Sequence, residues 1–435
     1  MTRCRRIRKR YPPVLLLLCL PVFLAPAWSS DEESMPLQEA VSSQSLVNLQ
    51  HFDHLFTEIQ VGNKKMGVVN IYSEYPDYDY VAAPAEGFAC VDDAARAIIL
   101  LSEYWKSTHD DDILLKNKNL VEFVLYMQNA NGYFNNFIWP DGSINTSYRT
   151  SLAEMNWWSF RALWGLEVAH ELVLSDLDLA NRIDDATKKV VVNIKKDISL
   201  ADSRTEIVNT IEVPTWLPHK YAADQAAIAI IALLPHYKRS GDSQVLEIIN
   251  ALASGIMQMQ KGDADNYPYG MFLSWKNLWH AWGNSQAYAL LLAGEQLDKP
   301  EYTRSALTEI DYFYPYLLNN GFSDSIQIKR ESGGFSELKK TRFPQIAYGI
   351  RPMVYAASEA FRITKDQKYL ALSARLRSWF FGQNDAARII YDQDSGRIYD
   401  GIISATEINM NSGAESTIEG LLVIQDNQPG TPNEQ

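Results

Sequence analysis

Apolar residues recur at helical spacing in six stretches of the chain, and each stretch opens with polar or Trp residues. The stretches begin near positions 91, 152, 221, 281, 345 and 412, so successive starts are 61, 69, 60, 64 and 67 residues apart. A more charged helical stretch precedes each of them. Because apolar residues at i, i+3, i+4 and i+7 are typical of a helix with one buried face, the repeat predicts six helical hairpins. Each hairpin pairs an apolar inner helix with a more polar outer one.

The hairpins are predicted to close into a ring. The predicted inner helices cover 91–106, 152–173, 221–236, 281–296, 345–363 and 412–425. The predicted outer helices cover 44–60, 112–129, 177–198, 242–260, 300–318 and 366–381. The long connections all lead from an outer helix to the next inner helix, and they cover 62–89, 130–150, 200–220, 261–280, 319–344 and 382–411. We therefore predict an all-α fold, an (α/α)6 barrel with long loops on one face, where functional residues tend to gather.

Little β structure is expected. No segment alternates cleanly enough to build a large sheet. Short hairpins are expected within the loops at 62–89 and 383–411, which are rich in turn residues.

The N-terminal sequence predicts export. Residues 1–29 combine basic residues, an apolar run of roughly a dozen residues and small residues at Ala25 and Ala27, the pattern of a secretory signal peptide. The run is short for a membrane span, so an uncleaved anchor is the less favoured alternative. We expect a secreted or periplasmic protein without a stable membrane anchor. A flexible lead-in (30–43), one barrel domain (44–425) and a disordered tail (426–435) are expected to follow the signal.

Charge limits the possible partners. The whole chain has 40 basic and 53 acidic residues, a net charge of −13. Loss of the six basic residues among the first ten positions would leave 34 against 53, a net charge of −19. So acidic a surface repels nucleic acid, and no nucleic-acid partner is expected. A highly acidic polysaccharide would fit only where a local basic patch accepts it.

Cysteine usage and motifs predict neither a disulfide nor a cofactor. Cys90 is the one cysteine after residue 29, so the processed chain cannot form an intrachain disulfide. A small buried thiol is a simpler interpretation of Cys90 than a nucleophile, because no matched His motif accompanies it. The sequence has no HExxH, paired CxxC or GxSxG, and no GxGxxG after a strand. No metal site is predicted.

The starts of the inner helices bring polar and aromatic residues to one mouth of the predicted ring. Sugars have apolar C–H faces that stack on aromatic rings, and hydroxyls that need converging donors and acceptors. These residue types predict an oligo- or polysaccharide substrate. The candidate substrate-binding residues are Arg96, Glu154, Trp157, Trp216, Asp224, His280, Trp282, Asn284, Tyr348, Arg351 and Asn411. Helix capping is the alternative for the acidic residues among them, core packing for the Trp residues and a structural hydrogen bond for His280.

Three carboxyl groups are candidates for catalysis. Glycoside hydrolysis needs one group that protonates the leaving oxygen and one that activates water or attacks the sugar. Asp92 and Asp93 of the first inner helix and Glu415 of the last supply such a set. Neighbouring helical residues diverge by about 100°, so one Asp is expected to face the mouth and the other to cap the helix. A first-turn carboxylate keeps a low pKa and suits the base, whereas desolvation would raise the pKa of Glu415 and suit the acid. The structural alternative is an ion pair of Glu415 with one of three arginines, Arg96, Arg161 and Arg351.

Several motifs resemble a known superfamily. GFACVDDAARA (87–97), WFFGQND (379–385), YDQDSGRIYDGI (391–402) and NSGAESTIEGLL (411–422) together resemble the six-hairpin glycosidase-like superfamily. The similarity is closest to uncharacterised secreted members and to helical regions attached to some bacterial glycosyltransferases. It spans roughly residues 70–425 and implies an (α/α)6 barrel with a carbohydrate ligand. It carries over Asp92, Asp93, Arg96, Asn411 and Glu415 as motif positions.

The similarity to inverting endoglucanases of the (α/α)6 type is looser. In those enzymes a pair of Asp residues serves the water and a C-terminal Glu is the acid. This chain departs from them, because its Asp pair is followed by Ala-Ala-Arg and their His-rich segment is missing.

Three functions therefore stay open at the level of sequence. The leading hypothesis is an inverting glycoside hydrolase acting on a neutral or weakly charged glycan. The second is a polysaccharide lyase or sugar epimerase with His219, His280 or Tyr348 as base; converging Arg351 and His280, with the carboxylates turned away, would favour it. The third is a non-catalytic glycan-binding protein.

Overall fold

A computed structural model describes residues 46–198 and 204–426, all within one compact unit, Ser45–Gln435. The predicted signal peptide (1–29) and lead-in (30–43) lie outside the described residues, as do residues 427–435 of the predicted tail. Asp426, assigned to that tail, instead ends the last helix, where its carboxylate accepts a hydrogen bond from the Ser358 hydroxyl and pairs with Arg377. No helix among the described residues is long and apolar enough to cross a bilayer.

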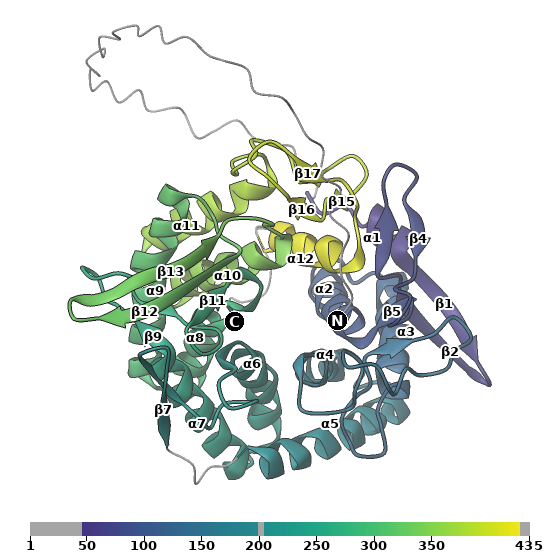
Figure 1. Cartoon of the computed structure of the whole chain (residues 1–435). Coiled ribbons are helices and arrows are strands. Elements are labelled where there is room, and N and C mark those ends of the chain that lie inside the picture. The colour runs from purple at the N-terminus through teal and green to yellow at the C-terminus, as the bar shows by residue number, and fades with distance from the viewer. Residues whose placement is uncertain (1–45, 199–203, 427–435) are drawn as a thin grey trace, which may run out of the picture. The chain divides into compact units, whose positions relative to one another are not determined.

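Six inner helices form a closed ring (Figure 1). They are α2 (Val91–Thr108), α4 (Trp157–Leu172), α6 (Ala223–Ser240), α8 (Gln286–Gln296), α10 (Ala347–Thr364) and α12 (Ala414–Gln425). Each packs against the next, and α12 packs against α2. The predicted (α/α)6 barrel is confirmed, and ring closure brings segments more than 300 residues apart into contact.

The outer helices cover the ring from outside. They are α1 (Gln50–Leu55), α3 (Asp111–Tyr126), α5 (Leu177–Asp197), α7 (Ser243–Met259), α9 (Pro300–Asn320) and α11 (Gln367–Arg377), with short 3-10 turns η1 (Ala281–Gly283) and η2 (Ser378–Phe380) before α8 and after α11. As predicted, inner-to-outer connections are short and outer-to-inner connections are long. The inner helices therefore begin on the long-loop side of the ring, which is the mouth.

The first predicted outer helix, 44–60, is wrong over most of its length. Of its described residues, 46–60, only Gln50–Leu55 is helical, and Phe56–Val61 forms strand β1, which pairs with β2 (Lys64–Val69). The turn between them is Gly62-Asn63, with Gly62 at φ +58. A two-residue turn that contains a left-handed glycine fits the right-handed twist of a hairpin, and this local signal prevails over the helical spacing of apolar residues.

The long loops carry short antiparallel strands. Besides β1 and β2 these are β3 (Tyr72–Glu74), β4 (Asp79–Val81), β5 (Ala89–Cys90), β6 (Phe137–Ile138), β7 (Thr205–Val208), β8 (Ile211–Pro214), β9 (Gln260–Lys261), β10 (Met271–Phe272), β11 (Leu278–His280), β12 (Ser325–Glu331), β13 (Gly334–Thr341), β14 (Tyr391–Asp392), β15 (Arg397–Ile398), β16 (Gly401–Ile402) and β17 (Ile408–Asn409). The hairpins expected within 62–89 and 383–411 are confirmed as β3–β4, β14–β15 and β16–β17. The β7–β8 hairpin and the three-stranded sheet β11–β12–β13 were not expected.

Small residues allow the inner helices to pack closely. α6 is buried at every position from Ala223 to Leu234, as a helix between a ring core and an outer layer should be. At Gly165 of α4, an added Cβ would lie 3.1 Å from the carbonyl oxygen of Ala95 on α2. This close contact brings the first turn of α2 near the second turn of α4, where the charged residues of the mouth meet.

Candidate active site

Arg96 of α2 holds four carboxylates at the mouth. Its Nη1 lies 2.8 Å from Asp93 and 3.3 Å from Asp92, and its Nη2 lies 2.8 Å from Oε2 of Glu415 on α12. Its Nε lies 2.8 Å from Glu419, as an ion pair without hydrogen-bond alignment. The guanidinium is only 3% exposed. The predicted Asp and Glu candidates therefore do converge, on one buried cation.

A second arginine fixes Asp92. Arg161 of α4 donates from Nη1 to both carboxylate oxygens of Asp92, at 2.6 and 2.5 Å, and from Nη2 to the hydroxyl of Tyr348 on α10. The Tyr348 ring lies 4.9 Å from the Arg96 guanidinium and 5.0 Å from that of Arg161. Contact of each guanidinium with the aromatic ring is favourable because the cation meets the negative π surface.

Arg351 and Glu419 form the floor of this cluster. Glu419 is fully buried, and Arg351, 3% exposed, donates to it from Nε. Arg351 was expected to bind substrate, but its guanidinium is used by Glu419 and lies over the Tyr355 ring at 4.9 Å. It supports Glu419, which in turn supports Arg96.

The surroundings separate the pKa values of the three candidate carboxyl groups. Burial acts to raise the pKa of Asp92, but Arg161 and then Arg96 more than offset it, so this pKa lies below the usual 3.8. Burial raises the pKa of Asp93 despite Arg96. Burial also raises the pKa of Glu415 to about 7, with Arg96 opposing it and Asp93 adding to it. The Glu415 side chain is nevertheless 41% exposed, so solvent can reach its carboxyl group.

Local sequence explains which Asp faces the mouth. Cys90 is the N-cap of α2, and its sulfur accepts from the Asp93 amide while its thiol donates to Oδ2 of Asp93 at 3.2 Å. Asp93 is thereby tied to the helix start and is 6% exposed, whereas the Asp92 side chain is 18% exposed. Cys90 is a buried thiol, and burial raises its pKa. The interpretation as a small structural thiol beside the Asp pair is confirmed.

A second cluster lies at the starts of α6 and α8. His280 donates or accepts through Nε2 at 3.0 Å from Asp224, and its ring stacks on Trp282 with centroids 3.6 Å apart. His280 is 3% exposed, while Trp282 is 40% exposed and lies 6.2 Å from Trp157. Trp157 in turn lies over Arg161, 5.0 Å from ring centroid to guanidinium carbon. An aromatic wall thus leads from the second cluster to the first.

Four of the predicted binding residues have local partners instead. Asn284 is buried and donates weakly to the Gly349 carbonyl, and Glu154 accepts from Asn156 next to it. Asn411 accepts from the Tyr75 amide and so holds the 62–89 loop. The assignment of Trp216 to the mouth is wrong, because its indole donates to the Ala251 carbonyl on outer helix α7.

Three residues important to the cluster were missed or misjudged in the sequence. Arg161 was considered only as a structural partner of Glu415, yet a lone arginine within the apolar WWSFRALWGL run signals a buried ion pair. Glu419 stands four residues after Glu415 and therefore on the same helix face. Tyr72 of β3 was not considered; it is 45% exposed, and burial of its hydroxyl, with Glu86, Asp93 and Glu415 nearby, raises its pKa.

The carboxylates of the mouth are arranged around an arginine. Among the described residues, no group of three or more His, Cys, Asp and Glu side chains could hold a metal ion. Arg96 occupies the centre where a cation would otherwise neutralise the carboxylates. What remains available at the surface is Asp92 with its lowered pKa, Glu415 with a pKa raised to about 7, and an aromatic wall.

Comparison with known proteins gives fold-level similarity. No protein-family model matches the sequence, and no curated protein sequence matches it significantly. A sugar epimerase from a ruminal bacterium is 11% identical over 88% of this chain and 95% of its own, with a TM-score of 0.59. The cellobiose 2-epimerase of Bacillus thermoamylovorans B4167 is 11% identical over 83% of this chain and 92% of its own, with a TM-score of 0.56. A family 76 glycoside hydrolase from a bovine Bacteroides thetaiotaomicron strain is 12% identical over 88% of this chain and 77% of its own, with a TM-score of 0.54. The chain thus has the fold of the six-hairpin glycosidase-like superfamily, as the motifs indicated.

Proposed function

We propose that this protein is an exported glycoside hydrolase that cleaves a neutral or weakly charged glycan with inversion. Glu415 is the general acid that protonates the leaving oxygen. Asp92 is the base that activates water. Arg96, Arg161 and Asp93 hold these two groups in place, and Trp157 and Trp282 bind the sugar faces. The signal-like sequence of residues 1–29 supports export.

The observation that carries this proposal is the opposite pKa shift of two solvent-accessible carboxyl groups held by one guanidinium. Asp92 has a lowered pKa and Glu415 a pKa of about 7. A site with one carboxylate kept ionised and one carboxyl group kept protonated can supply base and acid at the same pH. A surface that only binds neutral sugars does not need two carboxyl groups with such different pKa values.

The two groups meet the two terminal nitrogens of one guanidinium. Asp92 contacts Nη1 of Arg96 and Glu415 contacts Nη2. Because both carboxylates touch one planar guanidinium, their contacting oxygens are at most roughly 8 Å apart. This bound includes separations typical of inverting enzymes, about 6.5–9.5 Å, and of retaining ones, about 5–5.5 Å, so the configuration of the product decides between the two outcomes.

The lyase or epimerase alternative has weaker support. It needs a base such as His280 open to the substrate, but the His280 ring is 3% exposed beneath Trp282 and bonded to Asp224. It also favours Arg351 beside His280, whereas Arg351 is paired with Glu419. His219 lies on the loop before α6 and bonds the Met155 carbonyl.

Incubation of the purified protein with a panel of neutral and weakly charged oligosaccharides tests the proposal. Products are followed by proton NMR from the first minutes, before the anomers equilibrate. We expect new reducing ends with the anomeric configuration opposite to that of the cleaved bond. Retained configuration would overturn inversion. An unsaturated product, epimerisation without cleavage, or no reaction on any glycan would overturn the hydrolase proposal.

A further inference from the structure

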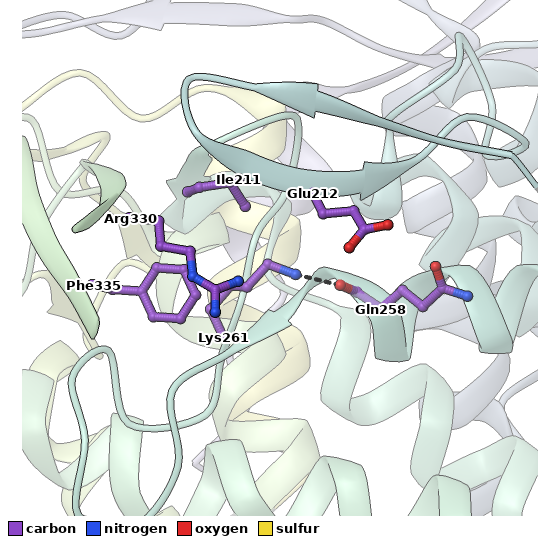
Figure 2. Close-up of a pocket in the computed structure, with 6 residues that line it drawn as sticks. All are labelled: Ile211, Glu212, Gln258, Lys261, Arg330 and Phe335. Atoms are coloured by element: carbon purple, nitrogen blue, oxygen red, sulfur yellow. Dashed lines mark hydrogen bonds between the residues drawn. The ribbon is translucent and has the colours of Figure 1, made fainter. Parts of the chain in front are cut away.

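A separate cavity of about 230 Å³ opens among three of the long loops (Figure 2), and its lining shares no residue with the carboxylate cluster. It is lined by Ile211 and Glu212 of β8, Gln258 of α7, Lys261 of β9, Arg330 of β12 and Phe335 of β13. This volume is below the range of about 300–1,000 Å³ typical of pockets for drug-sized ligands. It therefore suits a single small ring.

Two basic side chains without an acidic partner face this cavity. Among the described residues, neither Lys261 nor Arg330 lies within 4.0 Å of a carboxylate oxygen, in contrast to the paired arginines of the mouth. Lys261 donates only to the Gln258 carbonyl at the end of α7, and the Arg330 guanidinium lies 5.9 Å from the Phe335 ring centroid. The one acidic group of the lining, Glu212, accepts from the Thr205 hydroxyl. The cavity is thus locally cationic in a chain of net charge −13.

The walls of the cavity are fixed to one another. Thr210, at the tip of the β7–β8 hairpin, accepts from the Arg330 amide at 2.9 Å and donates to the Arg330 carbonyl at 3.1 Å. Asn209, beside it, donates to Asn277 at 3.0 Å. Because both residues of the hairpin turn, Asn209 and Thr210, are hydrogen-bonded to neighbouring segments, Ile211 and Glu212 stay opposite β12. The cavity is therefore preformed.

One strand connects this cavity to the mouth. β12 begins at Ser325, which pairs with His280, and reaches the cavity five residues later at Arg330. At about 3.3 Å per residue this is roughly 17 Å along the strand. A short oligosaccharide can extend over such a distance, and both places lie on the long-loop side of the ring.

We propose that this cavity is an accessory subsite for one anionic sugar residue, such as a uronate, of the glycan bound at the mouth. Lys261 and Arg330 pair with the carboxylate, the Phe335 ring and Ile211 contact the apolar face of the sugar, and Glu212 and Gln258 accept or donate hydrogen bonds to its hydroxyls. The subsite goes beyond the proposed hydrolysis, and only its connection to the mouth rests on that function.

The state of Lys261 gives the subsite a pH dependence. Burial lowers the pKa of Lys261 to about 8, with Glu212 of β8 opposing and Arg330 of β12 adding to the shift. The ammonium is therefore charged at pH 6.5 and largely neutral at pH 9. An anionic ligand should bind more weakly at the higher pH, whereas a neutral sugar should show no such loss.

Direct binding measurements separate this proposal from catalysis. Glucuronate, glucose and inorganic phosphate are titrated by NMR at pH 6.5 into the wild-type protein and into Lys261→Met, Arg330→Gln and Lys339→Met. Lys339→Met removes the same charge from an exposed position of β13. We expect glucuronate to bind at least tenfold more tightly than glucose, each of the first two variants to weaken it at least tenfold, and Lys339→Met to leave it unchanged.

Three outcomes would overturn the proposal. Equal glucuronate affinity in the wild type and in both cavity variants would place its binding elsewhere. Phosphate binding as tight as glucuronate binding would mean a simple anion site. An unchanged glucuronate affinity both at pH 9 and in Lys261→Met would exclude Lys261 as the partner. Circular dichroism of each variant confirms its fold, and none of these readouts depends on glycan cleavage.

Discussion

Arg96 and Glu415 are 319 positions apart in the chain, yet Nη2 of the first lies 2.8 Å from Oε2 of the second. This contact joins the first inner helix to the last across the point where the ring closes. Only a completed ring brings Glu415, the proposed acid, to the cation that holds it. The candidate active site is therefore complete only when α12 is docked against α2.

Glu415→Gln should abolish most of the hydrolysis. The amide keeps the shape of the side chain but cannot donate a proton to the leaving oxygen, and general acid catalysis typically contributes roughly 10²–10⁴-fold. We expect kcat to fall by that factor, with KM little changed, when release of reducing ends is measured at pH 6. Substrates with activated leaving groups that need no protonation should be affected much less. Near-normal turnover of an unactivated glycan would refute the role of Glu415.

The same variant should change how stability depends on pH. Glu415 has an ordinary pKa of 4.5 and a folded-state pKa of about 7. The folded state then holds more protons than the unfolded state between these values, so this group's contribution to stability falls as pH rises through that window. Glu415→Gln removes the effect, and its melting temperature relative to wild type should be higher at pH 7.5 than at pH 4.5. A constant difference in melting temperature would show that the pKa is not raised.

The hydrolysis proposed for the wild-type protein should follow a bell-shaped pH profile. kcat/KM reports the free enzyme, in which Glu415 must be protonated and Asp92 ionised. Activity should fall as pH rises above about 7 and should fall on the acid side only below the usual Asp value of 3.8. A profile of kcat/KM against pH in buffers of constant ionic strength gives both limbs. An alkaline limb above pH 9 would contradict the assignment of the acid.

Asp92→Asn and Asp93→Asn should differ in how much activity and stability they lose. Asp92 is the proposed base, so its amide variant should lose roughly 10²–10⁴-fold in kcat, and it should also lose about 3–5 kcal/mol of stability because the buried Arg161 is left without its anionic partner. Asp93 ties Cys90 and Arg96 to the start of α2, so its variant should lose stability of about 1–3 kcal/mol and activity less severely. Urea unfolding and steady-state kinetics on both variants provide the comparison. Equal kinetic losses would show that the two groups act as one unit.

The architecture could be predicted because it depends on periodicity. Apolar helices repeating every 60–70 residues, with all long connections on one side, have few solutions besides a closed ring of hairpins. The same reasoning brought Asp92, Asp93 and Glu415 together. It failed at 44–60, where Phe52, Phe56 and Ile59 fit the spacing of a helix but the Gly-Asn pair that follows forms a hairpin turn.

The details of the site depend on tertiary contacts that spacing does not contain. Asp92 and Asp93 are equivalent in the sequence, and only the position of Arg161 on the neighbouring helix makes one of them the more acidic. Trp216 precedes an inner helix like the other candidates, yet its loop turns it toward α7. The cationic cavity combines side chains from three loops whose lengths give no indication of where they meet.

Trp282→Ala should weaken substrate binding more than it slows the chemical step. The Trp282 side chain is 40% exposed and donates no hydrogen bond to the carboxylate cluster. Loss of a stacking surface removes binding that is equal in ground state and transition state, which raises KM without lowering kcat. We expect KM to rise roughly three- to thirtyfold. Trp282→Phe, which keeps a flat apolar face, should recover most of the affinity, and a large fall in kcat in both variants would point to a role for His280 beneath the ring.

Arg96→Met should destabilise the fold, and more so at high pH. Arg96 is buried and holds Asp92, Asp93, Glu415 and Glu419, and removal of one partner from a buried ion pair typically costs about 3–5 kcal/mol. Without the cation, the pKa values of the remaining carboxyl groups would rise. These groups would be protonated at acid pH, where their repulsion is relieved, and ionised at higher pH. The stability of the variant should therefore fall as pH rises. Urea unfolding at pH 5 and pH 8 measures this, with Arg182→Met, which removes a surface pair with Glu122, as the control. A loss in Arg96→Met no larger than in the control, at both pH values, would show that the cluster does not depend on its central guanidinium.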